Sequence, residues 1–114
     1  MTHIYKICSA RLWQDAEERG FLPGSPDDIR DGFIHFSTAA QVVETVARHF
    51  AGRTDLVIVA VDATALGDAL RYEPSRGGDL FPHLYGPLAV AAATWARPLP
   101  LDADGRHAFP DLVP

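Results

Sequence analysis

The sequence predicts an α+β domain in which two helices from the first half of the chain pack on a mixed or antiparallel sheet. Two segments with a helical spacing of apolar residues lie before residue 53, and most of the strand-like segments follow it. The chain has 114 residues, of which 47% are hydrophobic, enough for a core that needs no metal or disulfide. We therefore expect a single domain over residues 1–114.

The first predicted elements are a strand and a helix. Residues 3–8 (HIYKIC) alternate in character, which is typical of a strand. Ser9 is suited to cap a helix that runs to about Arg19, and Gly20 is suited to end it. The next segment, residues 21–30, is dense in proline, glycine, serine and aspartate, and this composition predicts a loop.

A second strand and helix are predicted directly after this loop. Residues 33–37 indicate a short strand, and Thr38 with Gln41 three residues later matches the capping box of a helix start. Gly52 is placed to end this helix. Its apolar stripe is predicted to consist of Val42, Val43, Val46, Ala47 and Phe50.

The second half of the chain is expected to supply most of the sheet. Residues 55–61 (DLVIVAV) are nearly all apolar and rich in β-branched side chains, as in a strand buried on both faces. Residues 69–73 and 81–85 are candidate strands on either side of a loop. Residues 89–96 are predicted to form another strand, although their alanines equally suit a helix. An Asp-Gly turn predicts a last short strand at 106–109.

Charge and composition exclude several classes of function. The net charge is −5 and the ten basic residues are scattered, so we do not expect DNA as a partner. The longest apolar stretches are far too short to span a bilayer, and no secretory signal opens the chain. Cys8 has no second cysteine to pair with and is expected to be a buried structural thiol. These features predict a cytoplasmic protein without membrane contact, and they identify no protein partner.

The segment DGFIHFS (31–37) carries the first candidate site residues. In a strand, Phe33, His35 and Ser37 share one face, and the two residues between them share the core face. An imidazole and a hydroxyl would then lie at the start of a helix, where free N–H groups favour anions. The alternative is structural: Ser37 caps the helix and His35 is a hydrogen-bonded histidine of the sheet.

The segment YEPSRGGDLFPHLYG (72–86) holds a second concentration of polar groups. Arg76, Gly77 and Gly78 can form a concave run of N–H groups beside a guanidinium, which would favour a phosphate or a carboxylate. The alternative is a surface turn with a solvated arginine. The other polar and aromatic candidates of this segment are Tyr72, Glu73, Ser75, His83 and Tyr85.

Other chemistries find little support in the sequence. The aspartates at 27, 28 and 31 could orient the imidazole of His35 or could form a solvated turn. The five histidines show no zinc-type pairing, so no metal is predicted. There is no phosphate-binding glycine motif of the P-loop or GxGxxG type, and no GxSxG motif to support a serine hydrolase.

These segments resemble a family of small uncharacterised bacterial proteins, domain of unknown function 952. The resemblance runs from IYKI at 4–7 to DGRHAFP at 104–110. Its most specific parts are DGFIHFST (31–38), Gln41, HFAG (49–52), EPSRGG (73–78) and FPHLYG (81–86).

The family is distantly similar to the ADP-ribosyltransferase fold, which includes the NAD-dependent RNA 2′-phosphotransferases. The resemblance implies an ADP-ribosyltransferase-like sheet, NAD or another phosphorylated nucleotide as ligand, and a transferase reaction. It leaves Glu73, His83 and Tyr85 as alternatives for the later acidic, histidine and aromatic positions of the fold. Together with the glycine loop, this gives His35, Glu73 and His83 as candidate catalytic residues, and Ser37, Arg76, Gly77, Gly78 and Tyr85 as candidate ligand-binding residues. His35 and Ser37 match the position that binds the nicotinamide-side ribose. The alternative is a non-enzymatic domain that senses a small molecule or binds a protein.

Overall fold

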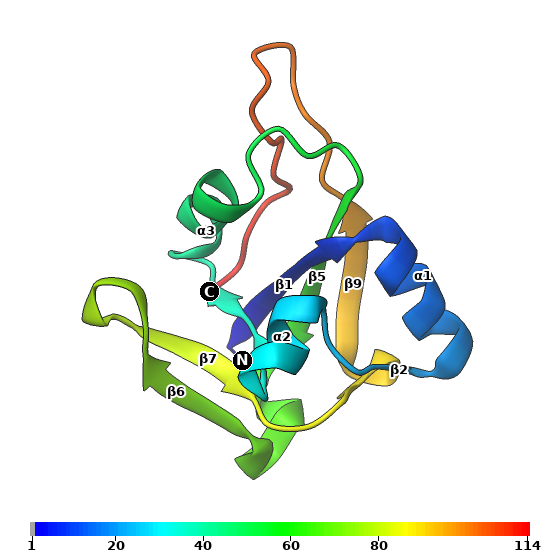
Figure 1. Cartoon of the computed structure of the whole chain (residues 1–114), viewed down its shortest axis with the longest axis vertical. Coiled ribbons are helices and arrows are strands. Elements are labelled where there is room, and N and C mark those ends of the chain that lie inside the picture. Colours follow the sequence, from blue (N-terminus) through cyan, green and yellow to red (C-terminus); the bar gives the residue numbers. More distant parts are fainter. Residues whose placement is uncertain (1) are drawn as a thin grey trace.

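The computed structural model describes residues 2–114, apart from the side chain of Arg76. Its main sheet contains β1 (His3–Ser9), β4 (Ser37–Thr38), β5 (Leu56–Asp62) and β9 (Ala93–Pro98), in the order β4-β1-β5-β9 with antiparallel neighbours. Helices lie on both sides of these strands in Figure 1. This arrangement confirms the predicted α+β class with an antiparallel sheet.

The central strand β5 is buried on both faces, as its apolar sequence predicted. Val59 and Val61 belong to one core cluster, which also contains Trp13 and Leu22. The alternate residues, Leu56, Ile58 and Ala60, belong to a second cluster on the other face. Because β1 and β9 pair with both edges of β5, this strand has no free edge along most of its length.

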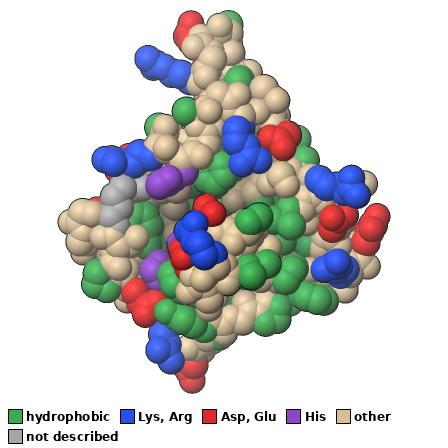
Figure 2. All heavy atoms as spheres, viewed as in Figure 1, with side chains coloured by type: hydrophobic (Ala, Val, Ile, Leu, Met, Phe, Trp, Pro, Cys, Tyr) green, Lys and Arg blue, Asp and Glu red, His purple; other side chains and the backbone are tan. Residues whose placement is uncertain are grey.

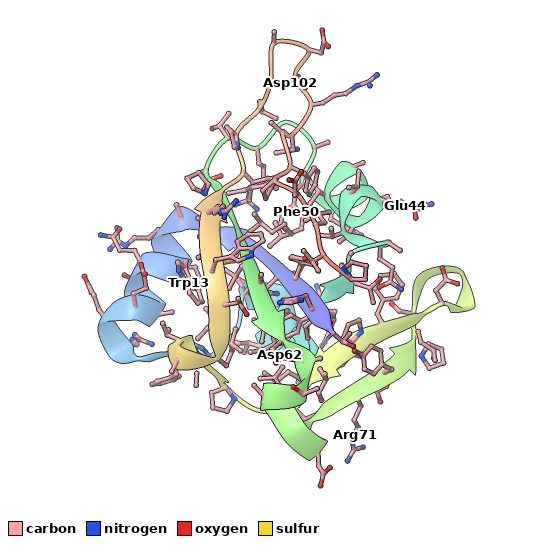
Figure 3. All side chains as sticks on the ribbon, turned by 180° about the vertical axis from the view of Figure 1, so that it is seen from behind. Trp13, Glu44, Phe50, Asp62, Arg71 and Asp102 are labelled. Atoms are coloured by element: carbon pink, nitrogen blue, oxygen red, sulfur yellow. The ribbon has the colours of Figure 1, made fainter. Side chains whose placement is uncertain are left out.

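Helix α1 (Ala10–Arg19) follows the prediction closely. The Ser9 side chain accepts a hydrogen bond from the Leu12 backbone N–H, 3.1 Å away. The helix ends where Gly20 takes a left-handed conformation with φ 90°. Trp13 points from this helix toward the sheet and is buried there (Figure 3).

The loop predicted at 21–30 is wrong, because this segment contains a strand and a helix. Strand β2 (Phe21–Leu22) pairs with β8 (Leu88–Ala89), and α2 (Pro26–Asp31) follows. Proline at the first helical position removes an N–H that has no helical partner, and the Asp28 carboxylate accepts the Ser25 N–H at 2.8 Å. The residues taken as loop signals therefore start a helix.

The strand predicted at 33–37 is broken at Phe36 and joins two sheets. Strand β3 (Ile34–His35) pairs with β7 (Leu80–Leu84), and β7 also pairs with β6 (Leu70–Pro74). Strand β4, two residues further on, pairs instead with β1. At the break, the Phe36 N–H donates to the Pro82 carbonyl at 3.0 Å. The β6–β7 hairpin thus extends from the main sheet, at the lower left of Figure 1.

Helix α3 (Val42–His49) is shorter than predicted, and it turns fewer of the predicted apolar side chains toward the core. It ends at His49, before Gly52, and the Gln41 side chain accepts the Thr38 N–H at 3.1 Å, one half of the predicted capping box. Val42 and Val46 are buried, but Val43 is 50% exposed. Ala47 is exposed as well, so neither Val43 nor Ala47 belongs to the core stripe.

The remaining corrections lie in the last third of the chain. Residues 89–96 divide into the end of β8, the 3-10 helix η3 (Val90–Ala92) and β9. Residues 106–109 form no strand, and only Leu101 and His107 make an isolated bridge. Two further 3-10 helices, η1 (Ala63–Ala69) and η2 (Arg76–Gly78), flank β6.

The C-terminal segment covers one face of the main sheet without regular structure. Leu99, Phe109 and Leu112 pack against the cluster on that face. The hydroxyl of the buried Tyr5 donates to the Val113 carbonyl at 2.7 Å and accepts the Val113 N–H at 2.8 Å. Among residues 2–114, no helix has the length and apolar character needed to cross a membrane.

Candidate functional site

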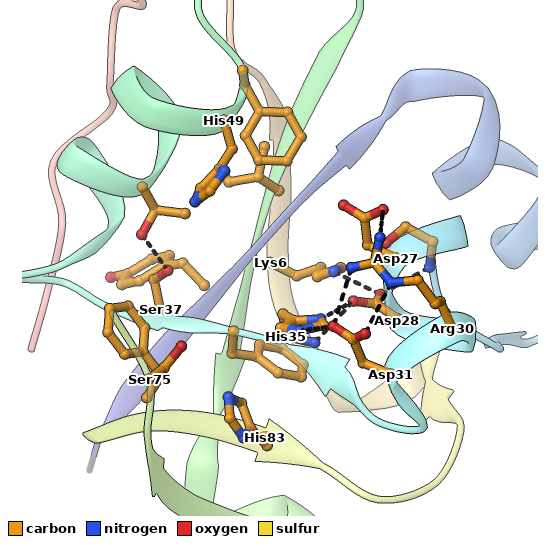
Figure 4. Close-up of a pocket in the computed structure, with 17 residues that line it drawn as sticks. Lys6, Asp27, Asp28, Arg30, Asp31, His35, Ser37, His49, Ser75 and His83 are labelled. Atoms are coloured by element: carbon orange, nitrogen blue, oxygen red, sulfur yellow. Dashed lines mark hydrogen bonds and ion pairs between the residues drawn. The ribbon is translucent and has the colours of Figure 1, made fainter. Parts of the chain in front are cut away.

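A pocket of about 290 Å³ lies between α2, α3 and β7 (Figure 4). His35, Ser37 and His83, three of the residues predicted from sequence, line it together. In the space-filling view, the same face of the molecule is hollowed near its centre, with histidine side chains at its edge (Figure 2). Residues separated by almost fifty positions in the sequence therefore share one cavity.

Strand pairing explains why the two candidate histidines meet. His35 on β3 is directly opposite His83 on β7, and their ring centroids are 5.6 Å apart in an edge-on arrangement. Phe33 packs against both rings, with centroid distances of 4.6 Å to His35 and 4.0 Å to His83. The aromatic ring thus holds the two imidazoles at one wall of the pocket.

His35 has a carboxylate at each ring nitrogen. Its Nδ1 lies 2.6 Å from Oδ1 of Asp28, and its Nε2 lies 3.0 Å from Oδ2 of Asp31. Ionised carboxylates only accept hydrogen bonds, so both nitrogens donate and the arrangement fits an imidazolium. Of the two readings of the aspartates, orientation of the imidazole is the one that the geometry supports. Asp27, by contrast, is exposed and pairs with Arg30.

Asp28 is the buried centre of this network. Its side chain is 2% exposed and lies 2.7 Å from Nζ of Lys6, whose side chain is 5% exposed. Burial by itself raises the pKa of Asp28, but the hydrogen bond from His35 and the charge of Lys6 outweigh it and hold the pKa well below its usual range. A Cβ on Gly24 would lie only 2.9 Å from Cβ of Asp28, so glycine at 24 allows this close approach.

A second network backs the other wall of the pocket. Oε1 of Glu73 accepts a hydrogen bond from the Tyr85 hydroxyl at 2.7 Å and lies 2.8 Å from Nδ1 of His83. The Tyr85 hydroxyl and then His83 lower the pKa of Glu73, and the same carboxylate raises the pKa of Tyr85. Glu73 and Tyr85 do not line the pocket, so they reach it through His83.

Ser37 takes part in neither network. Its hydroxyl donates to Oγ1 of Thr45 at 3.0 Å, and Thr45 in turn donates to the Gln41 carbonyl at 3.1 Å. Ser37 therefore does not cap α3, and within the described residues its hydroxyl bonds to Thr45 and to no histidine. Its lone pairs are available to a ligand in the pocket.

The glycine loop only partly matches the predicted anion cradle. Gly77 and Gly78 adopt positive φ values of 68° and 84°, as glycine permits. The Gly78 N–H donates to the Ser75 carbonyl and the Ser75 N–H to the Asp79 carbonyl, so these two groups are used within the loop. Ser75 lines the pocket, whereas Gly77 and Gly78 do not. The prediction for the Arg76 side chain lies outside the described residues.

Sequence reasoning missed three basic residues of the pocket, Lys6, Arg30 and His49. Arg30 is exposed, and its charge is paired with Asp31 at 2.9 Å. Lys6 stands on β1 between Tyr5 and Ile7, and a lysine in the middle of an otherwise apolar strand was the signal for a buried charge. His49 lies in the last turn of α3, on the same side as Thr45 one turn earlier. Within the described residues, no group of histidine, cysteine and carboxylate side chains is arranged to hold a metal ion.

Fold and pocket together define a small α+β domain with a pocket whose wall combines paired charges with aromatic and aliphatic side chains. The chain belongs to the family described as Protein of unknown function (DUF952), whose model matches residues 7–96. It is similar to protein CC0527 from Caulobacter crescentus. The crystal structure of that protein has 48% identity, a TM-score of 0.90 and coverage of 94% of both chains. Its solution NMR structure has 50% identity, a TM-score of 0.84 and coverage of 93% of this chain and 91% of that chain.

No curated protein matches this chain. The match of the family model to residues 7–96 confirms the predicted family. The distant similarity to the ADP-ribosyltransferase fold is not shown by these comparisons and stays a prediction.

Proposed function

We propose that the pocket binds a phosphorylated nucleotide of the NAD type, with its ribose packed beside the His35 ring and hydrogen-bonded by Ser37 and His83. The observation that carries this proposal is that His35, Ser37 and His83, which come from three different strands, line one cavity. The volume of about 290 Å³ is near the lower end for ligand pockets, so it suits a nucleoside-sized part of such a ligand.

The free hydrogen-bonding groups of the pocket fit a ribose. Ser37 has lone pairs to accept from a hydroxyl, and His83 has its Nε2 left over because its Nδ1 faces Glu73. A ribose hydroxyl can donate to either atom. In a transferase reaction, His83 would be the group that meets the ligand, and Glu73 would position its ring through Nδ1.

A second candidate is binding without chemistry, and one observation favours it. Both ring nitrogens of His35 lie against carboxylates, so His35 cannot accept a proton unless a contact is lost. Glu73, which the transferase reading needs for orienting an acceptor, does not line the pocket. In this version the domain senses a nucleotide and leaves it intact.

Thermal unfolding with NAD, ADP-ribose and AMP tests the proposal. A ligand at one hundred times its Kd stabilises the fold by about 2.7 kcal/mol, which raises Tm measurably in a domain of this size. Ser37→Ala is expected to reduce that rise, and Thr54→Ala, at an exposed loop position, is expected to preserve it. If none of the three ligands raises the Tm of the wild-type protein, nucleotide binding is refuted.

The same samples distinguish a transferase from a domain that only binds the nucleotide. Release of nicotinamide from NAD, followed by proton NMR, would support the transferase reading. Stabilisation by NAD with no turnover would support the sensing domain. His83→Gln is expected to abolish turnover in the first case and to change only the affinity in the second.

A further inference from the structure

Lys6 is a buried cation with hydrogen-bond donors to spare. Its side chain is 5% exposed, and among the described residues Asp28 is the acceptor that its Nζ reaches, at 2.7 Å. An ammonium group has three N–H donors, and a buried donor without an acceptor is costly. Lys6 lines the pocket, so its remaining donors need oxygen atoms supplied from the pocket.

Asp28 cannot satisfy these donors, because its oxygens are already used. Oδ1 accepts from the backbone N–H of His35 at 3.0 Å and meets its Nδ1 at 2.6 Å. Oδ2 accepts a hydrogen bond from the Ser25 N–H at 2.8 Å and forms the ion pair with Nζ of Lys6. Asp28 is thus shared between the Lys6 ammonium and the His35 ring, whose Nε2 has a second carboxylate in Asp31, and it leaves no acceptor for the other two N–H groups of Lys6.

His49 faces Lys6 from the other side of the cavity. It projects from the last turn of α3 and lines the pocket, and no described residue bonds to its ring. Figure 4 shows the His49 ring directed into the cavity, with Lys6 between it and the Asp28–His35 pair. An acceptor group bound to Lys6 would therefore have a second N–H donor within the same space.

We propose that Lys6 and His49 form an oxyanion subsite, which takes a phosphoryl or carboxylate group of the ligand. The identity of that ligand as a nucleotide rests on the proposed function, whereas the chemistry of the subsite rests on the buried ammonium. The subsite places the acidic group of the ligand at β1 and α3 and not at the Gly77–Gly78 loop.

The test is a titration with inorganic phosphate, and separately with NAD, at constant ionic strength kept by sodium chloride. The readout is the NMR signals of the Lys6 ammonium and the His49 ring. Phosphate is expected to shift both, and Lys6→Met and His49→Ala are expected to weaken phosphate binding at least tenfold. Arg48→Ala is the matched control, because Arg48 directly precedes His49 on α3 and pairs with Glu44 outside the pocket, so the variant removes a full charge without touching the subsite.

Each outcome decides one of the two proposals. If neither phosphate nor NAD shifts the two signals, the subsite is refuted. If phosphate binds there but no nucleotide raises the Tm, the subsite stands and the proposed function fails. If NAD stabilises both variants as it does the wild type, the proposed function stands and the subsite fails. His49→Ala keeps the comparison decisive should Lys6→Met not fold, because His49 is exposed and has no described bond to lose.

Discussion

Asp28 holds His35 at two points with a single oxygen. Oδ1 accepts the backbone N–H of His35 and contacts its ring Nδ1, although the residues lie seven positions apart on different elements. The backbone contact fixes where β3 lies relative to α2, and the ring contact fixes the direction of the imidazole. The position of the pocket wall therefore depends on one buried carboxylate.

Replacing Asp28 by asparagine should destabilise the protein strongly. The change leaves the buried Lys6 without its counter-charge and removes one of the two carboxylates beside the His35 ring, and breaking a buried pair costs about 3–5 kcal/mol. Urea denaturation at pH 7 measures this difference. Asp27→Asn is the control on the same helix, because Asp27 is exposed and its loss should change stability by less than about 0.5 kcal/mol. Equal stability of the two variants would contradict the central role of Asp28.

The acid stability of the protein should also depend on Asp28. Its pKa in the folded state lies below the ordinary value of 3.8, so its contribution is complete above that value and is lost as the pH falls toward the folded pKa. We expect the gap in unfolding free energy between the wild type and Asp28→Asn to shrink below about pH 4. A gap that stays constant down to pH 2 would show that the carboxylate is not ionised in the folded protein.

Val59→Asp should unfold the protein. Val59 is fully buried on β5, and an unpaired charge there costs several kcal/mol against a total stability of about 5–15 kcal/mol. Circular dichroism during thermal melting is the measurement. Val43→Asp makes the same substitution at a half-exposed position of α3 and should melt close to the wild type. A folded Val59→Asp variant with native-like melting would mean that this strand is not the centre of the core.

Tyr85→Phe should raise the pKa of Glu73. The Tyr85 hydroxyl is the largest cause of the low pKa of this carboxyl group, and phenylalanine keeps the ring while it removes the hydrogen bond. Carbon-13 NMR of the Glu73 carboxyl during an acid titration follows the change. Tyr72→Phe, directly before Glu73 on β6, is the control. An unchanged Glu73 titration in Tyr85→Phe would refute the three-residue network.

Arg76→Ala tests whether the glycine loop contributes to ligand binding. If Arg76 contacts a phosphate, the variant should melt like the wild type without ligand and lose most of its stabilisation by a nucleotide that works on the parent protein. Arg11→Ala, at a highly exposed position of α1, is the control and should keep the full response. A full response of Arg76→Ala would leave ligand binding to the pocket residues alone.

Elements with local signals could be predicted from the sequence, and those that depend on distant partners could not. Both capping residues of α1 directly flank the helix in the sequence, and the apolar, β-branched composition of β5 predicts its burial. For the segment of α2 the composition predicts a loop, because proline, serine and aspartate are common both at helix starts and in turns. The segment forms a helix in which Asp28 is buried against Lys6. Lys6 lies on β1, far from this segment in the sequence, so no local pattern reveals the contact.

The candidate site shows the same division. The alternation of 33–37 correctly indicated that His35 and Ser37 face the same cavity, even though the strand is broken between them. The pairing of β3 with β7, which brings His83 opposite His35, is a tertiary contact that no local pattern specifies. The position of His49 also depends on a tertiary contact. Only the packing of α3 against the sheet directs this last residue of the helix toward the cavity, so the sequence does not indicate it.

The two hydrogen bonds between Tyr5 and Val113 bridge 108 positions of the chain, nearly its whole length. Synthesis proceeds from the N-terminus, so Tyr5 leaves the ribosome long before its partner exists. Until then, the sheet face that Leu99, Phe109 and Leu112 will cover stays open to water. The segment after β9 thus closes the interior around a side chain made 108 residues earlier, and a nascent chain stalled near residue 98 would expose that apolar face to chaperones and proteases.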